Sequence, residues 1–474
     1  MSDNADLRAA LIAALGQDAV LSTADDLAYY GTDRCRGSWQ VQPSLIVLPR
    51  TVDEVQAVVR ACAAHGVCIV PSGGRTGLTG GATAIAGEVV VSLERMKSVL
   101  EVDGASMTLR CEAGVTIGAV QDAANKIGLV YPVDFAAKGT AQVGGTIATN
   151  AGGVKVIRYG PTRNWVMAVR VVLASGEVLD TGGPLLKDNT GYDLKQLFVG
   201  AEGTLGIVVE ATLRLCPPPP GAVVALCAVA DLPRVLSLFT RVQRSGLTLQ
   251  AFECFDAGGL AHVLAHRGSE GRGPFEQPSP QHALIEVEVP AKGDAPRELT
   301  VDALMEVLGE AQEADEITDA VLAQTPQQAR DLWALREGIS ESLHSHRPHK
   351  ADVTLPLAQL PSFVSAWAAK KDEHLADVEA VVFGHIGDGN LHLNLLTPES
   401  ADPEAFRARC KAFDEHTYGL VRDRAGSISA EHGIGLLKRD HLHYSRDALE
   451  IDVMRTIRRA LDPTGMFNPG KIFE

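Results

Sequence analysis

Two histidines and a carboxylate with a neighbouring histidine carry the chemistry that this sequence offers most directly. His385 and His392 flank the turn of the stretch GHIGDGNLHLN, and Glu431 stands beside His432 in the stretch SISAEHGIG. Imidazole nitrogens and carboxylate oxygens bind Zn²⁺ or a similar divalent ion, and two histidines with one carboxylate leave positions on it open for a substrate. The alternative is a pair of hydrogen-bonded surface histidines, which is the commoner situation for two histidines on facing strands.

The element that would position these two histidines is a β-hairpin. Asp388-Gly389 favours a two-residue turn, because both central positions of such a turn need a positive φ angle. Pairing around this turn predicts that His385 lies directly opposite His392, with their Cβ atoms about 4.5–5.5 Å apart. The other face of the hairpin is apolar and is expected to be buried: Ile386, Leu391, Leu393 and Leu395. This geometry lets both imidazoles reach one ion, and Glu431 is the candidate for a third ligand.

Three glycine-rich stretches precede residue 215. They are PSGGRTGLTGG (71–81), KGTAQVGGTIATNAGG (138–153) and LFVGAEGTLGIV (197–208). Glycine lets consecutive backbone N–H groups point at one anion, so such a loop can hold a phosphate. Small residues at this density suit walls pressed against a flat, extended ligand. The chain has neither G-x-G-x-x-G nor G-x-x-x-x-G-K-[ST], so the three stretches predict a large nucleotide cofactor in a site of another type.

These stretches, in this order and followed by NPGKIF near the C-terminus, resemble the FAD-binding domain of the vanillyl-alcohol-oxidase type of flavoprotein. The resemblance spans nearly the whole chain and implies bound FAD. Relatives with covalently attached flavin often carry a histidine after the paired glycines of the first loop. Arg75 stands there, which implies non-covalent FAD. The implied FAD-binding residues are Pro71, Ser72, Gly73, Gly74, Arg75, Thr76, Gly77, Gly80, Thr140, Gly144, Gly145, Thr149, Asn150, Gly152, Glu202, Gly206, Ile207 and Asn468.

HxGDGNLH followed by AEHGIG is similar to the metal-containing D-2-hydroxyacid dehydrogenase branch of this family, which includes D-lactate, glycolate and D-2-hydroxyglutarate enzymes. This resemblance implies that His385, His392 and Glu431 are the metal ligands. It further implies that Asn394 contacts the substrate and that His432 is the general base. Two other histidine-rich stretches, HSHRPH (344–349) and HLH (441–443), are expected to be solvated surface.

The substrate expectation rests on three further residues. Arg336 and Ser340 are one turn apart on a helical pattern, and Lys350 begins KADVTLP. Each alone is more often a surface residue, but the combination resembles D-2-hydroxyglutarate dehydrogenases, in which Arg, Thr and Lys hold the distal carboxylate of the substrate. Ser340 replaces that Thr. A guanidinium and an ammonium can engage one carboxylate together, so a 2-hydroxydicarboxylate is favoured.

The expected reaction is therefore oxidation of a D-2-hydroxyacid, D-2-hydroxyglutarate first, to the 2-oxoacid by hydride transfer to flavin N5. D-lactate or glycolate dehydrogenation is the alternative within the family. A zinc-dependent hydrolase would use the same ligands but gives no reason for three glycine-rich walls. A flavoprotein subunit without chemistry of its own would need no His432.

Composition and charge limit the partners. Lys and Arg total 43 against 59 Asp and Glu, a net charge of −16, which argues against a nucleic-acid or anionic-membrane surface. The N-terminus carries early acids and no basic region before its apolar run, so it is not expected to be a secretory signal, and no stretch approaches the ~20 apolar residues of a membrane helix. The eight cysteines lack C-x-x-C spacing, which favours reduced thiols in a cytoplasmic protein. The family implies an electron-transfer flavoprotein or a quinone as electron acceptor, and a second copy of the chain is a further candidate partner.

The expected fold class is α+β. Residues 1–220 are assigned to an N-terminal helix and a two-subdomain FAD-binding domain, with a stiff boundary at the prolines 217–220. Residues 221–425 are assigned to a substrate domain, or cap, with an antiparallel sheet covered by helices. Residues 426–474 return to the flavin. Residues 6–30 are expected to be helical, and residues 266–281 to form a mobile loop.

Overall fold

The structure, a computed structural model, describes residues 2–35, 39–268, 273–291 and 295–473. The chain divides into two compact units. The first unit comprises Met1–Gly153, Tyr159–Pro218 and Glu431–Glu474, and the second comprises Val154–Arg158 and Pro219–Ala430. The boundary between Pro218 and Pro219 lies inside the run of four prolines, and the chain returns to the first unit at Glu431.

The first unit contains two sheets among its described residues. The smaller sheet has the order β1-β2-β4-β3, and its last three strands are parallel. The larger sheet, β5-β6-β9-β7-β8, is antiparallel throughout. The strands are β1 (Val20–Leu21), β2 (Leu45–Val47), β3 (Ile69–Ser72), β4 (Val89–Ser92), β5 (Val99–Asp103), β6 (Thr108–Glu112), β7 (Val166–Val172), β8 (Val178–Asp180) and β9 (Ile207–Arg214).

Helices around these sheets follow from local sequence signals. The helix α3 (Val52–Ala64) begins after Thr51, whose side chain accepts a hydrogen bond from the backbone N–H of Glu54. Its buried residues recur at helical spacing and belong to the core of the unit: Val55, Val58, Val59 and Cys62. The remaining helices are α1 (Ser2–Leu15), α2 (Ala24–Tyr30), α4 (Ile117–Asn125), α5 (Val143–Thr149), α6 (Val156–Tyr159), α7 (Lys195–Phe198) and α15 (Ala448–Leu461), of which α6 lies almost wholly in residues of the second unit.

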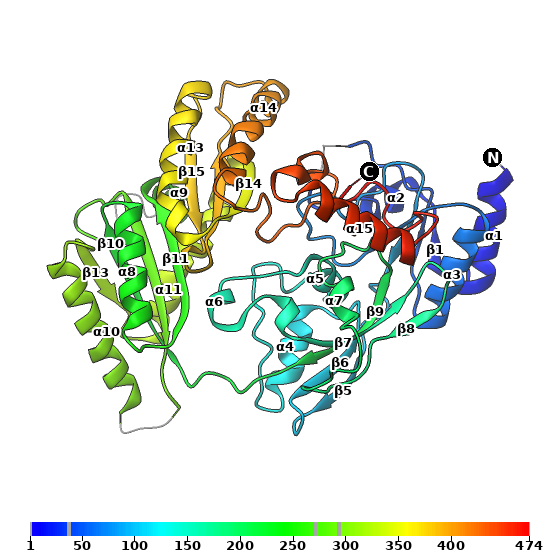
Figure 1. Cartoon of the computed structure of the whole chain (residues 1–474), viewed down its shortest axis with the longest axis horizontal. Helices are drawn as coiled ribbons and strands as arrows, with labels where there is room; N and C mark the ends of the chain where they lie inside the picture. The colour runs from blue at the N-terminus through cyan, green and yellow to red at the C-terminus, as the bar shows by residue number, and fades with distance from the viewer. Residues whose placement is uncertain (1, 36–38, 269–272, 292–294, 474) are drawn as a thin grey trace. The chain divides into compact units, whose positions relative to one another are not determined.

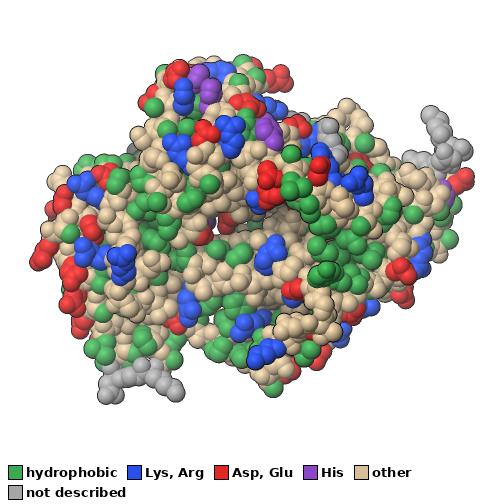
Figure 2. Space-filling view, viewed as in Figure 1, with side chains coloured by type: hydrophobic (Ala, Val, Ile, Leu, Met, Phe, Trp, Pro, Cys, Tyr) green, Lys and Arg blue, Asp and Glu red, His purple; other side chains and the backbone are tan. Residues whose placement is uncertain are grey.

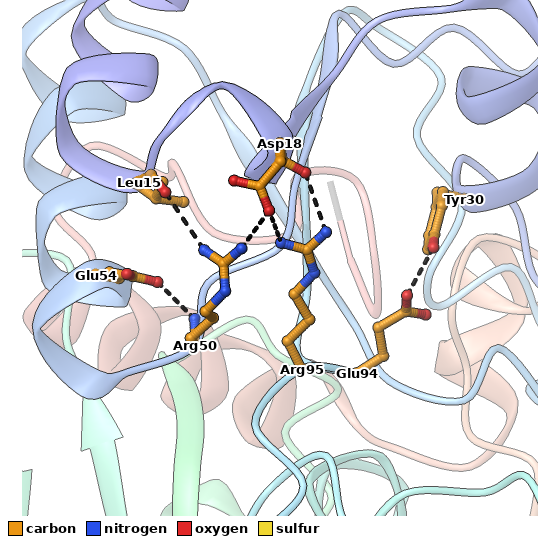
Figure 3. Close-up of polar contacts among 7 residues, drawn as sticks. All are labelled: Leu15, Asp18, Tyr30, Arg50, Glu54, Glu94 and Arg95. Carbon is orange, nitrogen blue, oxygen red and sulfur yellow. Dashed lines mark hydrogen bonds and ion pairs between the residues drawn. The ribbon is translucent and has the colours of Figure 1, made fainter.

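The N-terminal segment differs from the single helical stretch that was expected over residues 6–30. The helix α1 ends at Leu15, and Gly16 has a φ angle of 88°, which an α-helix does not tolerate. Asp18 then accepts hydrogen bonds from Arg50 and, at 3.0 Å, from Arg95 (Figure 3). These ion pairs tie the linker between α1 and α2 to the body of the first unit.

The second unit is built on one seven-stranded antiparallel sheet of order β13-β10-β12-β11-β15-β16-β14. Its strands are β10 (Ala222–Val229), β11 (Leu249–Asp256), β12 (Gln281–Glu288), β13 (Asp319–Leu322), β14 (His349–Thr354), β15 (Ala380–Gly384) and β16 (Asn390–Leu395). Its helices are α8 (Leu232–Arg244), α9 (Ala257–His266), α10 (Pro296–Glu313), α11 (Pro326–Glu337), α12 (Ile339–Ser342), α13 (Leu360–His374) and α14 (Pro403–Arg422). In Figure 1 α13 and α14 lie side by side, and Trp367 donates a hydrogen bond to Thr417 across them at 3.1 Å.

One face of this sheet matters for the site. Phe255 of β11 and Phe383 of β15 are buried there in one apolar cluster with Leu335 of α11 and Ile339 of α12. Residues two positions away along these strands share the same face, because side chains alternate along a strand. Glu253 and His385 are therefore directed to the face that α11 covers.

Several sequence expectations can now be compared with the structure. The fold is α+β, as predicted, and the eight cysteines are free thiols, five of them buried. Among the described residues, no helix combines the length and the apolarity needed to span a bilayer. On the face shown in Figure 2, Lys and Arg side chains are scattered among acidic ones. Of the loop expected over 266–281, residues 269–272 lie outside the described part of the chain.

Candidate active site

The three glycine-rich stretches meet in the first unit. The first follows β3, and a Cβ atom on Gly74 would lie 2.0 Å from the carbonyl oxygen of Thr140 in the second stretch, so only glycine fits at this approach. The third stretch packs against α5 of the second, because the N–H of Glu202 donates to the carbonyl of Ala148 at 2.8 Å. The walls predicted to enclose one cofactor are thus brought together, although their loops are far apart in sequence.

The C-terminal motif joins the same place. The side-chain amide of Asn468 donates to the carbonyl oxygens of Glu202 at 2.6 Å and of Gly81 at 2.9 Å. Its own backbone N–H donates to the carbonyl of Ile69 at 2.7 Å, just before the first glycine-rich loop. Asn468 is 1% exposed. Asn468, 266 positions after Glu202, therefore connects the C-terminal motif to the first and third glycine-rich stretches.

Glu202 fixes the loop that carries the candidate base. Its two carboxylate oxygens accept hydrogen bonds from the backbone N–H groups of Ile434 at 2.8 Å and Gly435 at 2.7 Å. Burial raises the pKa of this carboxyl, and the two N–H groups act against that rise. The hydroxyl of Thr79 also donates to the carbonyl of His432 at 3.2 Å. The backbone of His432 is therefore held by the first glycine-rich loop.

The first unit offers polar groups that fit a bound nucleotide. Among the described residues, the buried Oγ of Ser72, Oε1 of Gln142 and Oδ1 of Asn468 have no hydrogen-bond partner. Gly145 faces open space, and a Cβ atom on Gly73 would come within 3.7 Å of its Cα. Buried polar atoms without partners are costly, so a polar ligand at this position would satisfy them.

Among the described residues, four of the ten non-glycine residues with a positive φ angle are predicted cofactor residues. Arg75, Asn150, Glu202 and Asn468 have φ angles of 56°, 50°, 50° and 44°. Non-glycine residues rarely adopt this conformation, and such residues cluster at ligand sites. This pattern is a second fit between the first unit and a cofactor.

Arg75 is the residue from which the resemblance implied non-covalent FAD. Its guanidinium lies over the rings of Tyr29 and Tyr30, at 4.5 and 4.6 Å from their centroids, and 3.7 Å from Glu94. The hydroxyl of Tyr30 donates to Glu94 at 2.7 Å (Figure 3). Burial, followed by this hydrogen bond, raises the pKa of Tyr30 to about 12. Arginine stays protonated in proteins, so this side chain offers a positive charge and no nucleophile.

The hairpin of the second unit forms with a register that differs from the prediction. His392 pairs with Phe383, and Val382 pairs with Leu393, so His385 is not opposite His392. The strand β15 ends at Gly384, and residues 386–388 form a 3₁₀ turn before Gly389, whose φ angle is 82°. The predicted two-residue turn is wrong because the loop is longer. The shift is by two residues, which keeps both histidines on one face.

The two histidines nevertheless meet. Their ring centroids are 5.3 Å apart at an interplanar angle of 86°, and one nitrogen of each lies within 4.8 Å of the other. Ile386 and Leu391 are buried, as expected for the other face. The two histidines chosen from the sequence are thus close enough to bind one ion, although the loop between them is longer than predicted.

Each histidine has a carboxylate at its Nδ1 atom. Glu253 of β11 lies 2.8 Å from His385 Nδ1, and Asp352 of β14 lies 3.4 Å from His392 Nδ1. Asn390 holds the same oxygen of Asp352 with a hydrogen bond of 2.8 Å. Burial lowers the pKa of His392, and Asp352 acts in the opposite direction. A carboxylate at Nδ1 of each ring is an arrangement typical of metal-binding histidines, in which Nε2 is the nitrogen that ligates the ion.

The predicted substrate residues lie on the face of the sheet that carries the two histidines, or next to it. Lys350 pairs with Asn394 across β14 and β16, two residues from the pair of Asp352 and His392. Asn394 is buried, and its amide donates to the carbonyl of Val381 at 3.3 Å. Arg336 is buried in the last turn of α11, and its guanidinium lies 4.7 Å from the centroid of the Phe383 ring.

Two sequence expectations in this region need correction. Arg336 and Ser340 were expected one turn apart on one helix, but α11 ends at Glu337 and α12 begins at Ile339. Arg336 is 5% exposed, whereas Ser340 is exposed. Of the stretch HSHRPH, His344 is exposed but His349 pairs with Asp414 at 2.8 Å, so the stretch is only partly solvated.

Sequence reasoning missed the carboxylate partners of the histidines. Asp352 follows Lys350 in KADVT, where strand alternation places it on the same face. Glu253 is 0% exposed within AFECFD, between the buried Phe252 and Cys254. An acid between two apolar residues of a strand was the available signal, because buried carboxylates are almost always paired. Burial acts to raise the pKa of Glu253, but His385 and Arg336 outweigh it and lower the pKa overall.

Comparison with known proteins adds to this geometry. Residues 218–472 match the model of the C-terminal domain of FAD-linked oxidases, and residues 43–182 match an FAD-binding domain. A D-2-hydroxyglutarate dehydrogenase of Xanthomonas citri pv. viticola is 46% identical over 95% of this chain and 93% of its own length. A mitochondrial D-2-hydroxyglutarate dehydrogenase of Bos taurus is 37% identical over 92% of this chain and 77% of its own.

Solved structures show the same fold. p-Cresol methylhydroxylase with substrate bound has a TM-score of 0.80 over 100% of this chain and 97% of its own, at 18% identity. A 4-ethylphenol oxidase from Gulosibacter chungangensis has a TM-score of 0.79 at 18% identity, over the same shares of the two chains. At this identity the likeness concerns the fold alone, which is the flavoprotein fold that the sequence predicted.

Proposed function

This chain belongs to the family of FAD-linked oxidases and is an FAD-dependent dehydrogenase of a hydroxyacid, and we propose that it oxidises D-2-hydroxyglutarate to 2-oxoglutarate in a metal-dependent reaction. One observation carries the metal part of the proposal. The rings of two histidines lie 5.3 Å apart, and each has a carboxylate at Nδ1, at 2.8 Å for His385 and 3.4 Å for His392. Polar surface histidines would not require two buried carboxylates.

His385, His392 and Glu431 would hold the ion. Chain connectivity supports the third ligand. Ser427 exchanges backbone hydrogen bonds of 2.8 and 3.0 Å with Thr354 of β14, and Glu431 follows four residues later. Four residues span at most about 14 Å, so Glu431 cannot be far from the strand that carries Asp352.

The substrate would be oriented by its two carboxylates. Arg336 and Lys350 would engage the distal one, with Ser340 adding a hydroxyl, and Asn394 would contact the reacting end. Arg336 has a buried Nε atom without a hydrogen-bond partner in the described part of the chain, which leaves a donor for that carboxylate. D-Lactate and glycolate lack this group and remain the alternative substrates within the family.

The reaction divides between the groups as follows. His385, His392 and Glu431 would hold a divalent ion, which would supply a Lewis acid to lower the pKa of the C2 hydroxyl. The glycine-rich stretches would hold FAD without a covalent bond, and FAD would supply the hydride acceptor at N5. His432 would take the hydroxyl proton as general base. The hydrogen bond of 3.2 Å from Thr79 to the carbonyl of His432 supports this role, because Thr79 lies in the loop proposed to hold FAD.

We further propose an electron-transfer flavoprotein or a quinone as the electron acceptor, and the cytoplasm as the location. Eight free thiols favour a reducing compartment. The relative from Xanthomonas citri pv. viticola is bacterial, whereas the relative from Bos taurus is named as mitochondrial.

The test is anaerobic reduction of the purified protein. We expect a yellow protein whose flavin absorbance is bleached by D-2-hydroxyglutarate and much less by D-lactate. His392→Ala should lose activity while keeping its FAD. The control is His262→Ala, which removes a histidine paired with Glu379 elsewhere in the same unit, and it should keep both activity and FAD. Equal bleaching by D-lactate would refute the preference for a dicarboxylate substrate. Full activity of His392→Ala would refute the metal-dependent reaction, and a colourless protein would favour a hydrolase.

A further inference from the structure

We propose that Glu253 is a positioning residue that ties a metal-binding histidine to the arginine for the distal carboxylate of the substrate. One oxygen of its carboxylate lies 2.8 Å from His385 Nδ1, and the other lies 2.7 Å from a terminal nitrogen of Arg336. The inference rests on the proposed function, because it assigns a task to a residue that would touch neither the ion nor the substrate.

The place of Glu253 in the sheet makes this link rigid. It lies on β11, whose neighbours in the sheet are β12 and β15, and His385 follows the end of β15. Its side chain is 1% exposed, so solvent does not compete for either oxygen. A buried carboxylate with one partner removed would keep an uncompensated charge, which makes both contacts strongly favoured. The two partners are therefore held relative to one another by a single group on a central strand.

The contact with His385 sets the nitrogen that an ion can use. A carboxylate only accepts hydrogen bonds, so this contact requires a proton on Nδ1 of His385, and in the neutral ring Nε2 is then the nitrogen that can ligate an ion. Removing such a partner from a metal-binding histidine typically lowers metal affinity about 10–100-fold.

The contact with Arg336 sets the other end of the substrate. The guanidinium is held from one side by Glu253 at 2.7 Å and from another by the Phe383 ring at 4.7 Å. Its buried Nε atom has no partner among the described residues and is left to meet an anion. Because one carboxylate positions both His385 and Arg336, Glu253 would set the spacing that a D-2-hydroxydicarboxylate must match.

The experiment compares Glu253→Gln with the matched control Glu379→Gln. Glu379 pairs with His262 at 2.9 Å in the same unit, but its side chain is 57% exposed, and no ion pair between it and a site residue is found among the described residues. The measured quantities are metal per protein after dialysis, flavin absorbance, the melting temperature, and kcat and KM for D-2-hydroxyglutarate and D-lactate.

We expect Glu253→Gln to retain FAD, to lose metal about 10–100-fold more readily, and to raise KM for D-2-hydroxyglutarate more than KM for D-lactate. Glu379→Gln should behave as the wild type. Glu253→Asp keeps the charge but shortens the side chain by one methylene, so it should fold even if the glutamine variant does not, and should show the same two losses.

Each result decides the proposal. Unchanged metal retention and KM in Glu253→Asp or Glu253→Gln would overturn it. Loss of metal without a change in the KM ratio would also overturn it, because Glu253 would then serve His385 alone. A wild-type protein that binds no metal and oxidises no hydroxyacid would instead refute the proposed function, and that result is visible before any variant is made.

Discussion

The buried imidazole of His282 predicts an acid-sensitive contribution to stability. His282 is 2% exposed on β12, stacked between the rings of Phe255 and Phe275 at 5.1 and 5.8 Å. Burial lowers its pKa from 6.5 to about 4. The folded protein therefore binds this proton less readily than the unfolded chain does. The stability that the neutral imidazole contributes is complete above pH 6.5 and is lost as the pH falls toward 4.

The size of the loss follows from the shift. At 1.36 kcal/mol per pKa unit, the full loss is about 3 kcal/mol below pH 4, and about 2 kcal/mol is already lost at pH 5. For a unit of this size, 2 kcal/mol corresponds to a fall in Tm of roughly 4–8 °C. His282→Phe keeps an aromatic ring in the stack and removes the titration.

The assay is thermal unfolding at pH 7.5 and pH 5. The fall in Tm between these two values should be smaller by about 4–8 °C in His282→Phe than in the wild type. The larger ring can change the stability of His282→Phe equally at both pH values, and this change cancels when the fall in Tm of the variant is compared with that of the wild type. Every other titrating group is common to both proteins. His443→Phe, at an exposed position, should match the wild type. An equal fall in all three proteins would contradict the reasoning.

Three further predictions concern ligands. Gly145→Val should fold but lose most of its FAD, because a Cβ atom at this position enters the space proposed for the cofactor. The control Gly183→Val, which also has open space around it but lies in an exposed loop, should keep its FAD. The measurement is flavin absorbance per protein, and full FAD in Gly145→Val would refute the assignment. Acid precipitation should release all the flavin to the supernatant, because Arg75 offers no nucleophile for a covalent bond, and a yellow pellet would contradict this. Lys350→Met should raise KM for D-2-hydroxyglutarate by about 10-fold or more, because it removes a charge-assisted contact of about 1.5–3 kcal/mol, and should have little effect on KM for D-lactate. Steady-state kinetics that show an equal change for both substrates would contradict the role of Lys350 in binding the distal carboxylate.

Much of the fold was readable from local patterns. The helix α8 follows from apolar spacing at a period of 3.6, and the strand β12 follows from a short run rich in apolar residues. The chain around Gly16 was misjudged, because helical propensity on both sides concealed a break that depends on one positive φ angle. The break at Gly338 was missed for a related reason, since one glycine in a helical pattern is often tolerated.

The hairpin shows where local rules stop. Asp388-Gly389 predicted a turn, and a turn formed, but its length was decided by the packing of the loop. Gly387 lies against Ile157, and a Cβ atom on Gly389 would lie 2.2 Å from the carbonyl oxygen of Leu355. These neighbours come from distant segments, so the register could not be obtained from the hairpin sequence alone.

The sequence by itself determined which side chains are available for chemistry and which segments carry them. The three glycine-rich stretches, the two histidines and the arginine with its lysine were all identifiable by type and spacing. Only the tertiary structure decided that Glu253 meets His385, across 132 residues, and that Asp352 meets His392. The physical reason is that such pairs depend on the order of strands in the sheet and on their register, and no local propensity or periodicity encodes either.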